Sequence, residues 1–138
     1  MKILGLDLGT RTLGIAISDV TKTLARGVDN FRFQEADYDK AIERVLDITI
    51  KEKISAIVLG YPKNMDGTIG SQGKISEMFK KELSKVTDIP IILWDERLST
   101  QQASRNLITR QTKKAKRKKR IDEEAAIFIL QSYLDAKK

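Results

Sequence analysis

The chain opens with two short apolar runs that a glycine turn separates. Residues 3–8 form the first run, which a single carboxylate, Asp7, interrupts, and residues 13–17 form the second. Two such runs joined by a tight turn predict a β-hairpin. Side chains alternate along a strand, so Asp7 shares a face with Ile3 and Gly5. A carboxylate in that apolar setting is costly unless a hydrogen-bond donor or a cation pairs with it.

Helix and strand patterns alternate after the hairpin. We predict strands at residues 2–8, 13–19, 23–33, 54–61 and 90–95, and helices at residues 37–52, 75–86, 99–108 and 121–138. The fourth strand is almost entirely apolar, which is typical of a parallel strand buried on both faces. This order favours an α/β fold in which helices flank a mixed five-stranded sheet, antiparallel first and parallel later. We expect one three-layer domain over residues 1–138.

Composition narrows the chemistry that is possible. The 138 residues include no cysteine and no histidine, which excludes disulfides, thiolate sites, the usual zinc ligand and the usual general base. Any metal site must use oxygen ligands, which suit Mg²⁺ or Mn²⁺. The sequence has no stretch of about 18 apolar residues that could span a membrane and no secretory signal pattern. We therefore expect a cytoplasmic protein that does not contact a membrane.

Positive charge is concentrated in one tract. Eight of the eleven residues 110–120 are Lys or Arg and none is acidic, whereas the rest of the chain has 18 basic and 19 acidic residues. We predict a basic loop that attracts nucleic acid through phosphate contacts. The alternative is a solvated surface loop that has no partner.

Three carboxylates occupy similar predicted settings and could converge. Asp7 lies within the first strand, Glu96 directly follows the last strand, and Asp122 lies at the start of the final helix, on its apolar face. Like charges raise one another's pKa, and a divalent cation offsets that repulsion. Two metal ions about 3.5–4 Å apart would support hydrolysis of a phosphodiester bond without any histidine.

Each carboxylate also has a purely structural interpretation. Asp7 could accept hydrogen bonds from backbone N–H groups or pair with Arg11, and Glu96 could pair with Arg97. Asp122 could be the N-cap of its helix, which is a common position for aspartate. Convergence of the three side chains is what would favour the metal site.

Four segments together resemble the YqgF/RuvX family of bacterial proteins. They are LGLDLGTRTLGIAISD, VLGYPKNMDGTIGSQG, WDERLST and KRIDEEAAIFILQSYL, and the match runs nearly end to end. The resemblance implies a ribonuclease-H-like fold and a metal-dependent nuclease. Family members are described both as processing nucleases for the 5′ end of pre-16S ribosomal RNA and as Holliday junction resolvases. The family's acidic site falls on Asp7, Glu96 and Asp122.

Substrate contacts are expected around these acids. Asp7 would be the central metal ligand, and the glycine-containing loop, the turn after Glu96 and the basic tract would hold phosphates. The candidate binding residues are Arg11, Lys63, Ser71, Arg97, Ser99, Thr100, Lys116, Arg117, Lys118, Lys119 and Arg120. The glycine-containing loop could equally be a flexible connector. Tyr61 and Trp94 could stack on bases, but their buried strand positions favour packing in the core.

Other functions remain open on the sequence alone. The DLGT turn also occurs in the sugar-kinase, actin and Hsp70 class, but such ATP-binding proteins need two lobes, which 138 residues cannot hold. A nucleic-acid-binding module without catalysis is the second alternative. As a nuclease, the protein would act on pre-rRNA or branched DNA, as a monomer or a weak homodimer.

Overall fold

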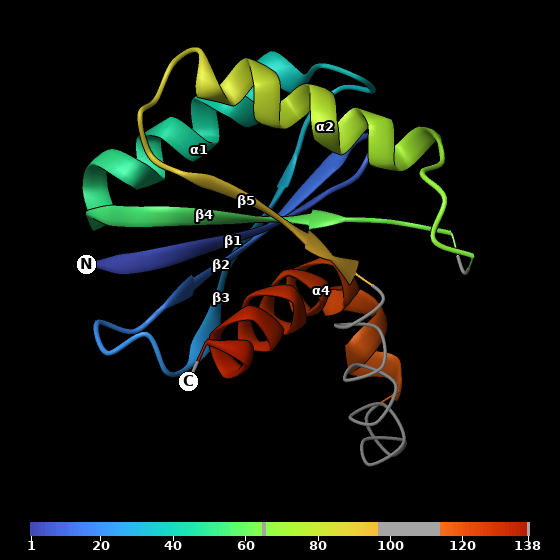
Figure 1. Cartoon of the computed structure of the whole chain (residues 1–138). Coiled ribbons are helices and arrows are strands. Elements are labelled where there is room, and N and C mark those ends of the chain that lie inside the picture. Colours follow the sequence, from blue (N-terminus) through green and yellow to red (C-terminus); the bar gives the residue numbers. More distant parts are fainter. Residues whose placement is uncertain (65, 97–113, 138) are drawn as a thin grey trace.

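A five-stranded mixed sheet forms the centre of the molecule (Figure 1). The computed structural model describes residues 1–64, 66–96 and 114–137, and for residues 114–123 it describes the backbone alone. The strands are β1 (Lys2–Leu8), β2 (Thr12–Ser18), β3 (Ala25–Arg32), β4 (Ile54–Tyr61) and β5 (Ile91–Asp95), and the helices are α1 (Tyr38–Glu52), α2 (Ser71–Ser84) and α4 (Lys114–Ala136). These bounds confirm the five predicted strands, because every strand end lies within two residues of its predicted position.

The order of the strands places β1 at the centre of the sheet. The order is β3-β2-β1-β4-β5. β1 pairs antiparallel with β2, and β2 with β3, whereas β1 and β4, and β4 and β5, are parallel. The predicted hairpin and the predicted change from antiparallel to parallel pairing are both confirmed. β1, which carries Asp7 near its end, therefore has a strand on either side.

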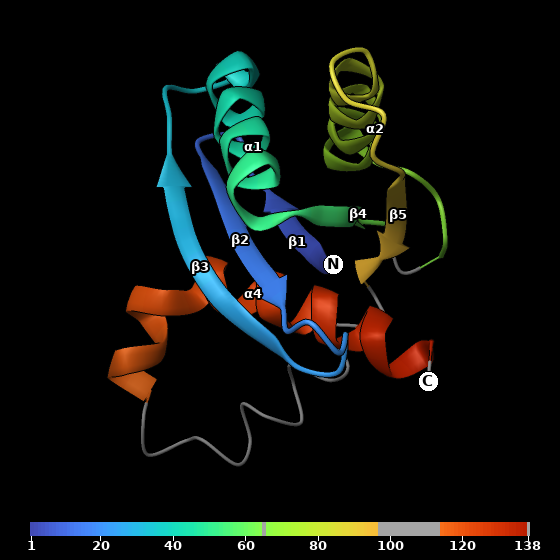
Figure 2. The ribbon, with the colours of Figure 1, turned by 90° about the vertical axis from the view of Figure 1, so that its left-hand side faces the viewer.

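Helices cover both faces of the sheet (Figure 2). α1 and α2 lie on one face and α4 on the other. Leu4, Leu6 and Leu8 pack into the cluster that includes Ala41 of α1 and Phe79 of α2. The opposite face packs against α4 and includes Ile3, Ala16, Val58, Ala126, Ile129 and Leu130. Asp7 shares a face with Ile3 and Gly5, as the alternation along β1 predicted, and in the structure this is the face that α4 covers.

A close approach fixes where α4 crosses β1. A Cβ atom at Gly5 would lie 2.6 Å from the Cβ of Leu130 and 3.3 Å from the carbonyl oxygen of Ala126. Ile3, two residues earlier on β1, lines a cavity together with Leu134, one turn later on α4. The helix therefore runs against the direction of β1. Its N-terminal part leads toward the end of the strand where Asp7 lies.

The prediction of a loop over residues 110–120 is wrong for its second half. α4 begins at Lys114, so the backbone of residues 114–120 is helical and Asp122 lies inside the helix rather than at its N-cap. Lys, Arg and Ala have high helix propensity, and neither Gly nor Pro interrupts residues 114–136. The helix predicted at residues 99–108 lies outside the described residues.

Candidate active site

Two of the predicted carboxylates meet across the sheet. Asp7 is paired with Gly14 near the end of β1, and Glu96 directly follows β5. Strand β4 lies between those two strands. The Glu96 side chain nevertheless reaches over β4 and shares a hydrogen bond with the Asp7 carboxylate. Both side chains are half-buried, so the pair lies at the carboxyl edge of the parallel strands with some access to solvent.

Gly60 makes this meeting possible. It lies on β4 opposite Trp94 of β5, one residue after the Leu59 that pairs with Leu6 of β1. A Cβ atom at this position would collide with the Oε1 atom of Glu96 and would lie 2.7 Å from the Cδ1 atom of Ile129. The missing side chain thus leaves the space that the Glu96 carboxyl group occupies.

The pair holds a proton in the absence of a cation. The pKa of Glu96 is raised from 4.5 to about 8, first by burial, and then by the charge of Asp7, the hydrogen bond to Asp7 and the charge of Asp95. A hydrogen bond between two carboxyl groups needs a proton on one of them, so Asp7 and Glu96 share one proton. At neutral pH the site therefore binds one positive charge as a proton.

The donor set fits a hard divalent cation. Two carboxyl groups share one small space, and a metal ion in place of the proton would allow both to ionise. The chain has no histidine or cysteine, so imidazole and thiolate ligands are excluded. Among the residues that the structure describes, no group of three or more potential ligands is found. Asp7 and Glu96 therefore bring two of the three predicted carboxylates together.

The third predicted carboxylate is placed only by its backbone. Asp122 lies one turn before Ala126 on α4. Contacts advance along β1 from Ile3 to Gly5 as they move back along α4 from Leu134 to Leu130 and Ala126. One further step of this kind leads to Asp7 on the strand and to the turn that contains residue 122 on the helix.

Three of the predicted binding residues precede β5 in the sequence, and each lies in a loop or at the start of a helix. Arg11, in the turn after β1, is exposed and forms an ion pair with Glu35 at 3.2 Å. The ammonium group of Lys63 lies 5.6 Å from the centre of the Tyr61 ring. Ser71 is exposed and is the first residue of α2.

The structure does not describe the side chains of the other predicted binding residues. Arg97, Ser99 and Thr100 lie outside the described residues. The backbone of Lys116, Arg117, Lys118, Lys119 and Arg120 lies in α4. Their contribution to binding stays a prediction.

Trp94 and Tyr61, the two aromatic residues that could stack on bases, both form hydrogen bonds within the chain. Trp94 donates a hydrogen bond from Nε1 to the Oγ atom of Ser132 at 3.1 Å and packs edge-to-face on Tyr133. The Tyr61 hydroxyl donates to Glu77 at 2.9 Å. The packing of Trp94 beside α4 confirms the core interpretation for this residue.

Gly60 and Gln72 are site residues that the sequence analysis missed. A glycine within an apolar strand indicates a close approach by another group, so Gly60 carried a usable signal. Gln72 donates a hydrogen bond from Nε2 to the carbonyl oxygen of Leu8 at 2.9 Å. No local pattern identifies that contact, because its two ends lie in different elements.

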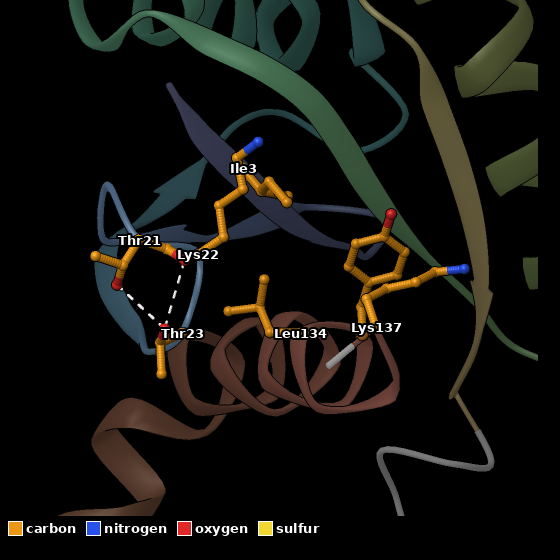
Figure 3. A pocket seen from close by; sticks show the side chains of 7 residues that line it. Ile3, Thr21, Lys22, Thr23, Leu134 and Lys137 are labelled. Atoms are coloured by element: carbon orange, nitrogen blue, oxygen red, sulfur yellow. Dashed lines mark hydrogen bonds between the residues drawn. The ribbon is translucent and has the colours of Figure 1, made fainter.

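A separate cavity lies at the opposite end of β1 (Figure 3). Its volume is about 450 Å³, and its lining residues are Ile3, Thr21, Lys22, Thr23, Tyr133, Leu134 and Lys137. No carboxylate is among them. The predicted site carboxylates therefore do not line this cavity.

Comparisons of the sequence with known proteins identify close relatives. A family model described as RuvX, Holliday junction resolvase, matches residues 1–136. A Bacillus pumilus protein is 48% identical over 136 residues, which cover 99% of each chain. A Bacillus subtilis protein is 46% identical over 136 residues, again covering 99% of each. Both relatives carry the provisional name pre-16S rRNA nuclease.

Solved structures share the fold at low sequence identity. A Thermus thermophilus RuvC in complex with a Holliday junction substrate aligns with a TM-score of 0.66 and 13% identity, covering 99% of this chain and 95% of that one. The fowlpox virus Holliday junction resolvase aligns with a TM-score of 0.58 and 17% identity, covering 99% of both chains. These likenesses confirm the ribonuclease-H-like fold.

Proposed function

The chain belongs to the RuvX family, and we propose that it is a metal-dependent nuclease that hydrolyses phosphodiester bonds at the Asp7–Glu96 edge of its sheet. The observation that carries this proposal is the hydrogen bond between these two carboxyl groups, which come from separate strands and meet over Gly60. Residues 1–138 would form one nuclease domain.

Asp7, Glu96 and Asp122 would hold the metal. Asp7 is the central ligand in this proposal, because it lies on β1, the middle strand of the sheet. The oxygen-only donor set favours Mg²⁺ or Mn²⁺. When bound, such ions activate a water molecule and stabilise the leaving oxygen of a phosphodiester. The protein's part is to hold the carboxylates in place and to release the Glu96 proton as the cation binds.

Basic and hydroxyl side chains around this edge would bind the substrate backbone. Phosphate contacts supply most of the affinity of such proteins and little of their sequence specificity. The proposed contacts are Arg11, Lys63, Ser71, Arg97, Ser99, Thr100 and the run Lys116, Arg117, Lys118, Lys119 and Arg120. The run belongs to α4, so it would approach the substrate from a helix.

Maturation of the 5′ end of pre-16S ribosomal RNA is the proposed reaction. The names of the Bacillus relatives, which match along nearly the whole chain, support this substrate. Resolution of four-way DNA junctions is the second candidate, and the description of the family supports it. Either substrate places the protein in the cytoplasm. In the described ranges, no helix is long and apolar enough to cross a membrane.

Cleavage of matched substrates tests the proposal. A pre-16S RNA 5′ leader and a four-way DNA junction are incubated with the protein in Mg²⁺ or Mn²⁺, beside the variants Asp7→Asn and Asp39→Asn. Asp39 is an exposed residue of α1, so the second variant makes the same charge change away from the site. We expect Asp7→Asn to lower the cleavage rate at least about 100-fold and Asp39→Asn to leave it unchanged.

The same variants separate a nuclease from a binding module. An Asp7→Asn protein that binds nucleic acid but does not cleave it would eliminate the non-catalytic alternative. An Asp7→Asn protein that cleaves as fast as the parent would refute the nuclease site. Asp7→Asn should not unfold the protein, because the asparagine amide keeps the size of the side chain and can still form a hydrogen bond with Glu96.

A further inference from the structure

The side chain of Gln72 joins α2 to the end of β1. Its Nε2 atom donates a partly buried hydrogen bond to the carbonyl oxygen of Leu8 at 2.9 Å, across 64 positions in the sequence. Leu8 directly follows Asp7. A contact that holds the Leu8 peptide group therefore also restrains the backbone that carries the central carboxylate.

Leu8 lies where β1 has left its parallel neighbour. The register between β1 and β4 ends with Leu6 and Leu59. Leu8 still pairs with Leu13 of β2 on the other side. Gln72 thus supplies a hydrogen bond at the edge where β4 no longer pairs with β1. A buried carbonyl group gains stability and a fixed direction from such a bond.

The first turn of α2 is itself held firmly. A Cβ atom at Gly73 would lie 2.8 Å from the carbonyl oxygen of Pro62 and 2.7 Å from the Cγ2 atom of Ile69, so the helix packs directly on the loop that follows β4. Because α2 cannot move freely, the Gln72 amide is an anchored donor rather than a mobile surface group.

We propose that Gln72 is a positioning residue, which sets the place of Asp7 for metal binding through its hydrogen bond to Leu8. It acts on the metal through the backbone and does not touch the substrate. The inference rests on the proposed function, since it assumes that Asp7 binds a divalent cation. Outer contacts of this kind typically change metal affinity by about 10- to 100-fold.

Gln131 offers a matched control. Its Oε1 atom accepts a hydrogen bond from the backbone N–H of Ala25 at 2.9 Å, and its Nε2 atom donates to the carbonyl oxygen of Thr23 at 2.9 Å. The same residue type thus joins a helix to the backbone of a distant segment. Those contacts lie at the turn that joins β2 to β3. In the sheet, β1 separates β2 from β4, beside which Gln72 acts.

The experiment compares Gln72→Met with Gln131→Met. Methionine keeps the length of the side chain and removes the donor. Mn²⁺ affinity is measured by titration calorimetry, and kcat and KM are measured on the cleaved substrate. We expect Gln72→Met to weaken Mn²⁺ binding and to lower kcat by roughly tenfold, with KM unchanged. Gln131→Met should lower the melting temperature and leave all three values at the parent's level.

Hydrogen exchange gives a readout that needs no metal. The Gly9 N–H donates to the carbonyl oxygen of Thr12 at 2.8 Å, one residue beyond Leu8. In the metal-free protein we expect Gln72→Met, but not Gln131→Met, to speed exchange of the Gly9 amide. Should Gln72→Met fail to fold, Gln72→Asn replaces it, because its amide is one methylene too short to reach Leu8.

The outcomes are distinct. Mn²⁺ affinity of the folded Gln72 variant within twofold of the parent would overturn this inference alone. A raised KM with unchanged Mn²⁺ affinity would also overturn it, by assigning Gln72 to direct substrate contact. A parent protein that binds no Mn²⁺ would overturn the proposed function, and this inference with it.

Discussion

At the scale of single residues, the shared proton of Glu96 makes the metal-free protein sensitive to pH. The pKa of this carboxyl group is about 8 in the fold and 4.5 ordinarily, because burial raises it first and the neighbouring Asp7 and Asp95 raise it further. Between these two values the folded protein keeps a proton that the unfolded chain releases. The free energy of unfolding should therefore fall as pH rises from about 4.5 to about 8, by up to a few kcal/mol.

Urea denaturation at a series of pH values checks this prediction. The Glu96→Gln variant has no proton to lose and should show a flatter profile over the same range. Saturating Mg²⁺ should stabilise the parent most near pH 8, where it replaces the departing proton. A metal-free parent that becomes more stable between pH 5 and pH 8 would contradict the shared-proton arrangement.

Gly60 gives a second prediction at this scale. Gly60→Ala should displace the Glu96 carboxyl group and crowd Ile129, lowering stability by about 1–3 kcal/mol and cleavage by at least roughly tenfold. Ile129→Val removes the crowded Cδ1 atom. The double variant should therefore recover stability without recovering cleavage. Recovery of cleavage in the double variant would show that Glu96 does not depend on the open space at Gly60.

Sequence patterns predicted the position of the Asp7 side chain better than that of Glu96. Alternation along β1 was sufficient to place Asp7 on the face of Ile3 and Gly5, whereas only the structure shows that α4 covers this face. The approach of Glu96 depends on the register of β4 against β5 and on one missing side chain, which only the folded sheet brings together. The hydrophobic periodicity of single segments carries no information about the distance between the Asp7 and Glu96 side chains.

At the scale of elements, residues 114–120 of the basic tract belong to α4. The concentration of charge over residues 110–120 led us to predict a loop, yet the high helix propensity of Lys and Arg and the absence of a helix breaker favour continuation of α4. Of the positions predicted for the inward face of the final helix, Ala126, Ile129, Leu130 and Tyr133 are confirmed, because they pack against the sheet.

Salt dependence of binding tests the function of this helical tract. Neutralising Lys116, Arg117, Lys118, Lys119 and Arg120 with glutamine should weaken binding of nucleic acid. The slope of log affinity against log salt concentration should decrease by roughly 0.7–0.9 for each phosphate interaction that the substitutions remove. The control is Lys40→Gln with Lys51→Gln, two exposed positions on α1. An unchanged slope in the tract variant would exclude it from phosphate binding.

At the scale of the whole molecule, the hydrophobic pattern was enough to predict the sheet. A hairpin followed by strands that alternate with helices allows few arrangements, because parallel strands need crossover helices. The observed order β3-β2-β1-β4-β5 is one of them. Convergence at the site is a property of that order, since it brings the ends of β1 and β5 to the same edge with β4 between them.

Each chain contributes one Asp7 and one Glu96, which has a consequence for the kinetics. One such site can make one cut at a time, whereas symmetric resolution of a four-way junction needs two cuts and suits two chains related by a two-fold axis. We therefore expect trimming of the RNA leader to depend on the first power of protein concentration. The rate of paired nicking of a junction, if it occurs, should approach a dependence on the second power of protein concentration when the protein is below its dimerisation constant.

Initial rates over a hundredfold range of protein concentration measure the reaction order for each substrate, and light scattering records the mass of the protein. A second-order dependence for the RNA leader would contradict a monomeric trimming enzyme and assign the catalytic unit to a dimer.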